Sequence, residues 1–181
     1  RARVDDATVL DEVVYRLRSA RARYAAWPLD EEAAAAYGRR PLRHEFGTVE
    51  EGLGRTYSRG QEAMAEASRA PGPESFHAWR KDAKYLRHQV EILAPLWPDV
   101  LGGHARALDR LGEALGDEHD LAVLLDLVRE DPGLCPHPRE RALLVALAQH
   151  RRSALQRDAL LLGARLYAEP PRLFVRRLHA Y

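Results

Sequence analysis

Apolar residues recur at intervals of three and four positions along most of the chain, which is the spacing of a helix with one buried face. The pattern predicts helical segments at residues 6–27, 48–69, 73–94, 99–115, 117–128 and 139–166. A short final helix is predicted from the apolar positions between Leu173 and Leu178. The alternation typical of β-strands is missing over any useful length, so we predict an all-α protein of antiparallel helices.

Proline and glycine mark the connections between these segments. Trp27-Pro28 ends the first helix, because a residue before proline is pushed out of the α region. Residues 29–37 are expected to form a short alanine-rich turn, and residues 38–47 a connector. Residues 131–138 form a firm break, and Pro170-Pro171 separates the last two helices.

Glycines inside the helical pattern have two expected roles. Gly116 interrupts the apolar period, so we expect the helix to end there and to restart with Asp117, Glu118 and Asp120 near its N-terminus. The glycines of residues 48–69 each weaken that helix by about 1 kcal/mol relative to alanine. We therefore expect them to permit close packing or a bend.

The segment at residues 73–94 has two distinct faces. Its apolar stripe consists of Phe76, Trp79, Ala83, Leu86, Val90 and Leu93. Its second stripe, the basic row, consists of His77, Arg80, Lys84, Arg87 and Glu91, with Lys81 and His88 beside it. At about 100° per residue the two stripes are centred roughly 130° apart. One side can therefore enter a core while the other stays in solvent or lines a groove.

Acidic residues are nearly absent from the basic row. Glu91 is the one acid within it, and Asp82 is the only other acid between Ser75 and Ile92. The whole chain has 28 Lys and Arg against 27 Asp and Glu, a formal net charge of +1. That balance argues against a protein that coats itself in nucleic acid, so an anion site must come from local segregation of charge. A solvated surface is the plain alternative for such a row.

Length and cysteine content limit the class of protein. A chain of 181 residues allows one domain or two small bundles and easily supports a core. Cys135 is the single cysteine, which excludes an internal disulfide and fits a reducing compartment. No apolar run approaches the length of a membrane span. We therefore expect a cytoplasmic protein.

The basic row and a motif downstream of it resemble a known family. The resemblance is carried by His77, Arg80, Lys81, Lys84, Leu86, Arg87 and Glu91, followed by Leu115, Gly116, His119, Asp120 and Leu121. The pattern over residues 76–128 is similar to the second half of a CHAD domain, the conserved histidine α-helical domain. The resemblance implies helical bundles around a basic channel that binds inorganic polyphosphate without transforming it. It implies neither enzyme activity, nor a metal, nor a cofactor.

The resemblance also implies a set of binding residues and a domain organisation. The polyphosphate-binding residues that we expect are Arg55, Arg59, His77, Arg80, Lys81, Lys84 and Arg87. Tyr57 is expected to add a hydroxyl beside the two arginines of residues 48–69. Residues 1–181 are expected to form one CHAD-like domain, with residues 1–70 completing a first bundle and residues 71–181 forming a second. The leading segment of the family is expected to be missing, because residues 1–50 lack its basic helix.

Expected partners follow from the same resemblance. Members of the family are sometimes fused to triphosphate-processing domains, so such a partner domain is implied, as is a location at polyphosphate granules. Nucleic acid should bind weakly or not at all, because its phosphates are spaced by sugars and the basic row offers few aromatic side chains for stacking.

Two other functions stay open from the sequence. His119-Asp120 is similar to the metal-binding pair of HD-type phosphohydrolases, with His104 and Asp126 as further candidate ligands. Alternatively, the basic row contacts an acidic protein, and the chain is a helical interaction module. A glycine-rich phosphate loop, a nucleophile elbow and an HExxH pattern are all missing from the sequence.

Overall fold

The computed structural model describes residues 47–181, which form a bundle of α-helices. The helices are α3 (Gly47–Arg69), α4 (Pro73–Leu93), α5 (Pro98–Glu130), α6 (Pro138–Leu166) and α7 (Pro171–His179). Two short 3-10 turns, η1 (Ala94–Leu96) and η2 (Pro132–Leu134), lie in the connections on either side of α5. No strand occurs among residues 47–181, so the predicted all-α class is confirmed. The helix expected at residues 6–27, the turn at 29–37 and nearly all of the connector lie outside the described residues.

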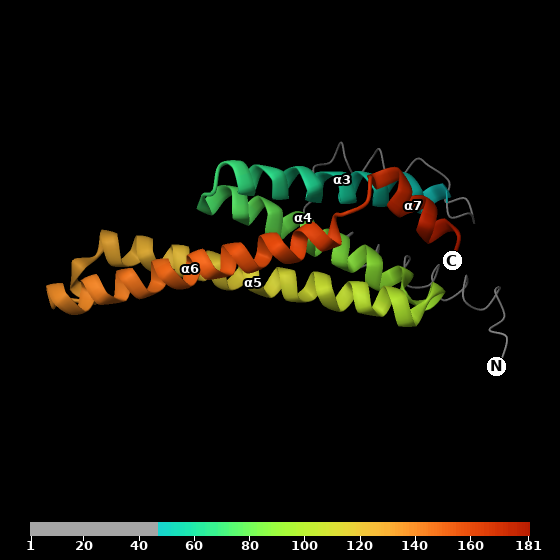
Figure 1. Cartoon of the computed structure of the whole chain (residues 1–181). Coiled ribbons are helices and arrows are strands. Elements are labelled where there is room, and N and C mark those ends of the chain that lie inside the picture. Colours follow the sequence, from blue (N-terminus) through green and yellow to red (C-terminus); the bar gives the residue numbers. More distant parts are fainter. Residues whose placement is uncertain (1–46) are drawn as a thin grey trace, which may run out of the picture.

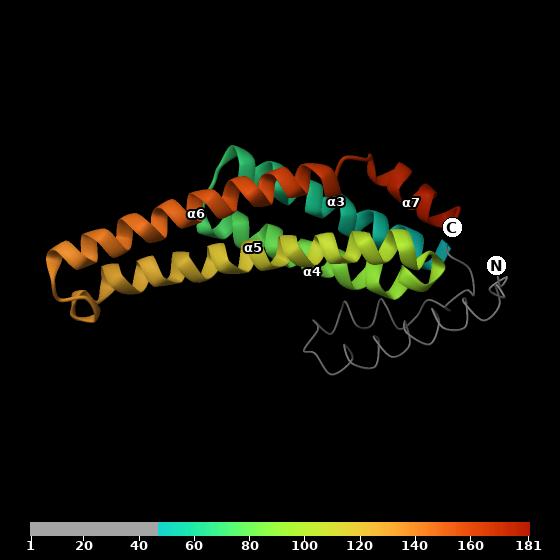
Figure 2. The same cartoon turned by 60° about the horizontal axis from the view of Figure 1, so that its bottom comes forward.

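Successive helices run up and down and pack against their neighbours in sequence (Figures 1 and 2). α4 lies between α3 and α5, α6 packs along α5, and α7 returns to α3. The distal ends of α5 and α6 extend past the connection between α3 and α4 in both views. The antiparallel bundle expected from the sequence is therefore the observed architecture.

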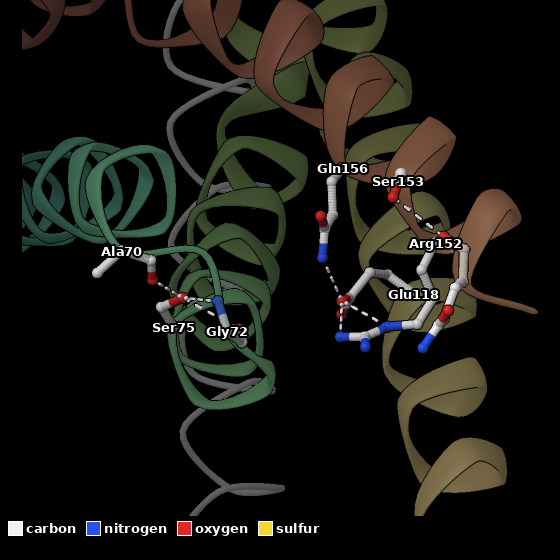
Figure 3. A network of polar contacts seen from close by, with 8 residues as sticks. Ala70, Gly72, Ser75, Glu118, Arg152, Ser153 and Gln156 are labelled. Atoms are coloured by element: carbon white, nitrogen blue, oxygen red, sulfur yellow. Dashed lines mark hydrogen bonds and ion pairs between the residues drawn. The ribbon is translucent and has the colours of Figure 1, made fainter.

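The apolar stripe predicted for α4 forms the centre of the core. All six of its residues are buried, and Trp79 is completely inaccessible to solvent. The helix begins with proline in its first turn, where a missing N–H costs nothing. Ser75 Oγ accepts a hydrogen bond from Gly72 N at 3.1 Å and lies 3.0 Å from the carbonyl oxygen of Ala70 (Figure 3). These two hydrogen bonds hold the turn between α3 and α4 in place.

The expected helix break at Gly116 is wrong, because α5 continues without interruption from Pro98 to Glu130. A single glycine costs a helix about 1 kcal/mol, which the packing of the surrounding turns offsets. Asp117 and Asp120 are consequently exposed residues in mid-helix, and neither is near a helix start. Gly116 itself is buried, at a point where α5 meets α4.

Close packing explains two of the glycines in this bundle. A Cβ atom added to Gly60 would lie 2.5 Å from the hydroxyl oxygen of Tyr167, and one added to Gly163 would lie 2.5 Å from Cζ2 of Trp79. Both distances are far below van der Waals contact. The expectation that glycines of residues 48–69 serve close packing is therefore confirmed at Gly60, whereas nothing lies within 4 Å of a Cβ built on Gly52.

Gly163→Ala should destabilise the protein by about 1–3 kcal/mol, although alanine is the better helix former, because the new methyl group overlaps Trp79. Gly112→Ala is the matched control, since nothing lies within 4 Å of its added Cβ, and it should stabilise by up to about 1 kcal/mol. Urea denaturation of both variants measures the difference. Equal effects of the two substitutions would show that α6 does not approach Trp79 as described.

A partly buried histidine beside Phe174 of α7 should make stability depend on pH. The His104 ring lies 5.7 Å from the Phe174 ring, centroid to centroid, and its Nε2 has no hydrogen-bond partner within residues 47–181. Burial, and secondarily the charge of Arg177, lower the pKa of His104 to about 4. In the unfolded chain the His104 imidazole is protonated near pH 6.5, whereas in the folded protein it is protonated only near pH 4. Stability from this group is complete above pH 6.5 and is lost as the pH falls toward 4.

His104→Gln should remove that loss. The free energy of unfolding of the parent protein should fall by roughly 2 kcal/mol more than that of the variant between pH 7 and pH 5. Denaturant titrations at the two pH values measure both changes. Parallel pH profiles of the two proteins would contradict the lowered pKa of His104.

Candidate functional site

The basic row lies on the face of α4 that points away from the core. Lys81 and Lys84 are exposed, whereas His77, Arg80 and Arg87 are partly buried. Arg80, Lys81 and Lys84 make no ion pair with any residue of the described part of the chain. Within residues 47–181 these three cations are therefore uncompensated by acids, which leaves them available to an anion.

Arg80 is held across the backbone of α5. A Cβ atom built on Gly116 would lie 3.4 Å from Nε and 3.5 Å from Nη2 of Arg80, so the guanidinium group lies directly over this glycine. An alanine Cβ at these distances would be in ordinary van der Waals contact with the guanidinium group, whereas a longer side chain at this position would displace it. Gly116, which the sequence suggested as a helix break, thus leaves space for the side chain of Arg80 from the neighbouring helix α4.

His77 meets a second histidine across the same helix pair. The rings of His77 on α4 and His119 on α5 are 4.9 Å apart, with an angle of 41° between their planes. Nδ1 of each ring is buried and has no hydrogen-bond partner among residues 47–181. A buried polar atom without a partner is costly, and it suits a ligand that supplies the missing bond. His119 is a candidate site residue that sequence reasoning assigned to a different chemistry.

A signal for His119 was present in the sequence. Gly112, Gly116 and His119 recur at intervals of four and three and therefore share one face of α5. Glycines on one face indicate that another helix or a ligand can approach there, and the histidine stands at the end of that stripe. In the structure Arg80 of α4 approaches Gly116, whereas nothing lies within 4 Å of a Cβ built on Gly112. The missing information was that α4 is the helix that meets it.

The other predicted arginines are engaged by acids. Arg87 contacts Asp109 on α5 and lies 3.6 Å from Glu91. Arg59 on α3 lies 3.0 Å from Asp82 of α4, and Arg55 contacts Glu51 within α3. Because Arg55 and Arg59 are exposed, their ion pairs with these acids contribute little to stability.

The structure does not bring the α3 arginines to the basic row. Asp82 and Lys84 are two residues apart, which places their side chains roughly 160° from each other around α4. Arg59, paired with Asp82, therefore lies on the opposite side of α4 from Lys84. The expectation for Tyr57 is also wrong: its ring is buried and its hydroxyl donates to the carbonyl oxygen of Leu166 at 3.1 Å. Burial raises the pKa of Tyr57, which keeps the hydroxyl protonated as a donor.

The metal-binding set imagined from His119-Asp120 does not assemble. His104 precedes His119 by fifteen residues on the same helix, which is about 22 Å along the axis. Asp126 lies two turns from His119, about 10 Å away along the axis. Within residues 47–181, no group of three or more His, Cys, Asp or Glu side chains is placed to hold a metal ion.

The remaining acid of this motif, Glu118, joins α5 to α6. Its side chain is 1% exposed, and Oε1 accepts hydrogen bonds from Arg152 at 2.5 and 3.1 Å and from Gln156 at 2.8 Å (Figure 3). A buried carboxylate is tolerated only when it is paired in this way. Glu118 therefore fixes the register of α6 on α5; it contacts α6, whereas His119 contacts His77 of α4.

Comparison with known families identifies the family of the chain. The family model of the CHAD domain matches residues 1–129, so the match contains the whole of the basic row, Gly116 and His119. No curated protein is significantly similar to the chain, and neither is any solved structure. Among the described helices, none combines the length and hydropathy needed to cross a bilayer. Because the match covers 129 of 181 residues, the chain belongs to the CHAD domain family.

Proposed function

We propose that this chain binds inorganic polyphosphate along α4 and does not transform it. The observation that carries the proposal is the set of uncompensated groups in one place. Arg80, Lys81 and Lys84 lack ion pairs within the described residues, and the buried Nδ1 atoms of His77 and His119 lack partners there. Membership of the CHAD family supports a polyphosphate-related role.

The chemistry of these groups fits a chain of phosphates. The guanidinium group of Arg80 offers several donors in a fixed fork, which suits phosphate oxygens, and lysine offers a mobile point charge. Histidine donates a single hydrogen bond to an anion or, when protonated, adds charge. From His77 to Lys84 the row covers about 10 Å of helix axis. That length engages several phosphates at once, whereas orthophosphate reaches only one or two groups.

Acidic residues limit the track at the Arg87 end. Glu91 and Asp109 share the charge of Arg87, and both would repel a polyanion. The part of the basic row without acid partners therefore ends at Lys84 and does not continue to Arg87 and Glu91. The α3 arginines belong to the proposal only as an extension for long polymers, because Arg55 and Arg59 face acids on a different side.

Asp109→Asn should strengthen polyphosphate binding several-fold at low salt, because it releases Arg87 and removes a repelling charge. Asp126→Asn is the matched control, since Asp126 is also an exposed acid of α5 that pairs with an arginine, Arg129, away from the row. The control should leave the affinity unchanged. Equal gains in the two variants would mean that only net charge matters.

A titration with three polyanions of equal charge tests the proposed function. Inorganic polyphosphate should bind more tightly than a short oligonucleotide and an acidic peptide, and it should be recovered intact. A preference for the acidic peptide would favour an interaction module. Release of orthophosphate that depends on a divalent metal and is lost in Asp120→Asn would favour a phosphohydrolase.

The proposal extends to location and to a companion domain. A polyphosphate binder of this type would collect at polyphosphate granules, and a triphosphate-processing domain would be a fitting neighbour, since both handle the same class of anion. A fluorescent fusion of the chain should follow the granules, and Arg80→Glu with Lys84→Glu should disperse it.

A further inference from the structure

α6 carries two apolar stripes, and only one of them is used by the bundle. The buried stripe consists of Ala148, Leu155, Ala159, Gly163 and Leu166. The second stripe, here called the outer α6 face, consists of Leu143, Leu147, Ala154 and Leu161. At about 100° per residue the two stripes are centred roughly 135° apart. The second stripe therefore points away from the core that the first one enters.

The three leucines of the outer α6 face are open to solvent, and Ala154 between them is partly buried. Leu143, Leu147 and Leu161 are 61%, 59% and 67% exposed. Leu147, Ala154 and Leu161 are spaced by seven residues, with Leu143 one turn before them, which is the spacing of a helix–helix seam. From Leu143 to Leu161 the stripe is about 27 Å long. It is long enough for a partner helix of several turns.

Positive charge flanks this stripe. The flanking residues are Arg139, Arg151, Arg157 and Arg165. All four are exposed, lie within roughly 60° of the centre of the stripe and make no ion pair with any residue from 47 to 181. Glu140 and Asp158 are the only acids of α6. The arginine of α6 that does pair with an acid, Arg152, points to Glu118 in the bundle.

The narrow apolar stripe and the flanking arginines decide which kind of partner fits the outer α6 face. A second copy of the chain packed in parallel would set each arginine beside its equivalent, and an antiparallel copy with the leucines matched would set Arg139 beside Arg165. A bilayer surface is a poorer fit, because the four apolar residues occupy only about 40° of the helix, and helices that lie in a membrane present a broader apolar face. A helix with acidic residues beside a narrow apolar seam complements both the leucines and the arginines.

We propose that the outer α6 face docks an acidic amphipathic helix of another protein. Leu147 and Leu161 pack into the apolar seam of that helix, and Arg151 and Arg157 face its carboxylates. The face lies beyond residue 129, outside the CHAD match, and on a different helix from the basic row. It is therefore independent of polyphosphate binding.

A synthetic helix supplies the test. The probe is a fluorescein-labelled peptide of about 21 residues with leucine at heptad positions a and d and glutamate at e and g. Its anisotropy is measured against the full chain. Leu147→Gln with Leu161→Gln should weaken binding about tenfold or more, and Arg151→Glu with Arg157→Glu should weaken it similarly and flatten its salt dependence. Both variants should melt like the parent, because the substituted side chains are exposed.

Matched controls test whether binding of the probe depends on the outer α6 face alone. Leu127→Gln with Leu134→Gln replaces two exposed leucines outside α6 and should leave the affinity unchanged, as should Arg80→Glu with Lys84→Glu. A scrambled peptide of the same composition should bind poorly. The proposal is overturned by equal binding of the scrambled peptide, by displacement of the probe by anionic phospholipid vesicles, or by self-association in sedimentation that Leu147→Gln abolishes.

Discussion

Replacing Arg80 and Lys84 together by glutamate should abolish polyphosphate binding while leaving the helical content unchanged. Neither side chain belongs to the buried apolar stripe of α4, and neither has an acid partner within the described residues. A hydrogen bond to a charged phosphate contributes about 1.5–3 kcal/mol, so loss of two corresponds to a drop in affinity of about a hundredfold or more. Isothermal titration of polyphosphate into parent and variant measures the change.

The control variant has the same change in net charge, but its substitutions lie on α5, outside the basic row. Arg110→Glu with Arg129→Glu alters two exposed arginines of α5 that are not part of the basic row. It should weaken binding only slightly and only at low salt, because charges beyond roughly 8 Å are screened at physiological ionic strength. An unchanged affinity in the folded Arg80 and Lys84 variant would remove the row from the binding site.

Trp79→Ala should cost about 3–5 kcal/mol of unfolding free energy, the largest loss of stability that we expect from one side chain. Trp79 is fully buried, lies beside Phe76 on α4 and touches the position of Gly163 on α6. Its removal leaves a cavity where α3, α4 and α6 meet. For a protein of this size the melting temperature should fall by roughly 10 °C.

Trp97→Ala serves as the matched control, because Trp97 is 44% exposed and touches one aromatic ring, that of Tyr181. It should cost roughly 1 kcal/mol. Chemical denaturation curves of the two variants compare the losses directly. Similar losses in both would mean that the apolar stripe of α4 is not the centre of the core.

The buried residues of α4 were predictable because an amphipathic helix buries one face, whose residues recur at a fixed spacing in the sequence. Spacing alone identified all six buried residues, from Phe76 to Leu93, and prolines marked the starts of α4, α5, α6 and α7. Gly116 misled the prediction because a glycine that breaks an isolated helix is indistinguishable in sequence from one that receives a neighbouring side chain. Only the position of Arg80 distinguishes the two cases.

The candidate site was predictable in part for the same reason. The row from His77 to Arg87 follows from helical spacing, but its partners depend on how α4 lies against α3 and α5. The pairing of Arg59 with Asp82 and the meeting of His77 with His119 join residues more than twenty positions apart. Helical periodicity contains no information on that register, so the sequence could not show that Arg59 faces Asp82 or that His77 meets His119.

A chain-length series tests the central claim, that the row on α4 is a polyanion track, most directly. Orthophosphate, triphosphate and long polyphosphate are titrated into the chain at two salt concentrations. Affinity should climb from orthophosphate to a chain that fills the roughly 10 Å row between His77 and Lys84. It should rise little beyond that length and should fall steeply with added salt, because bound cations release counterions from the polymer. Equal affinity for orthophosphate and the long polymer, or affinity that does not respond to salt, would contradict the account.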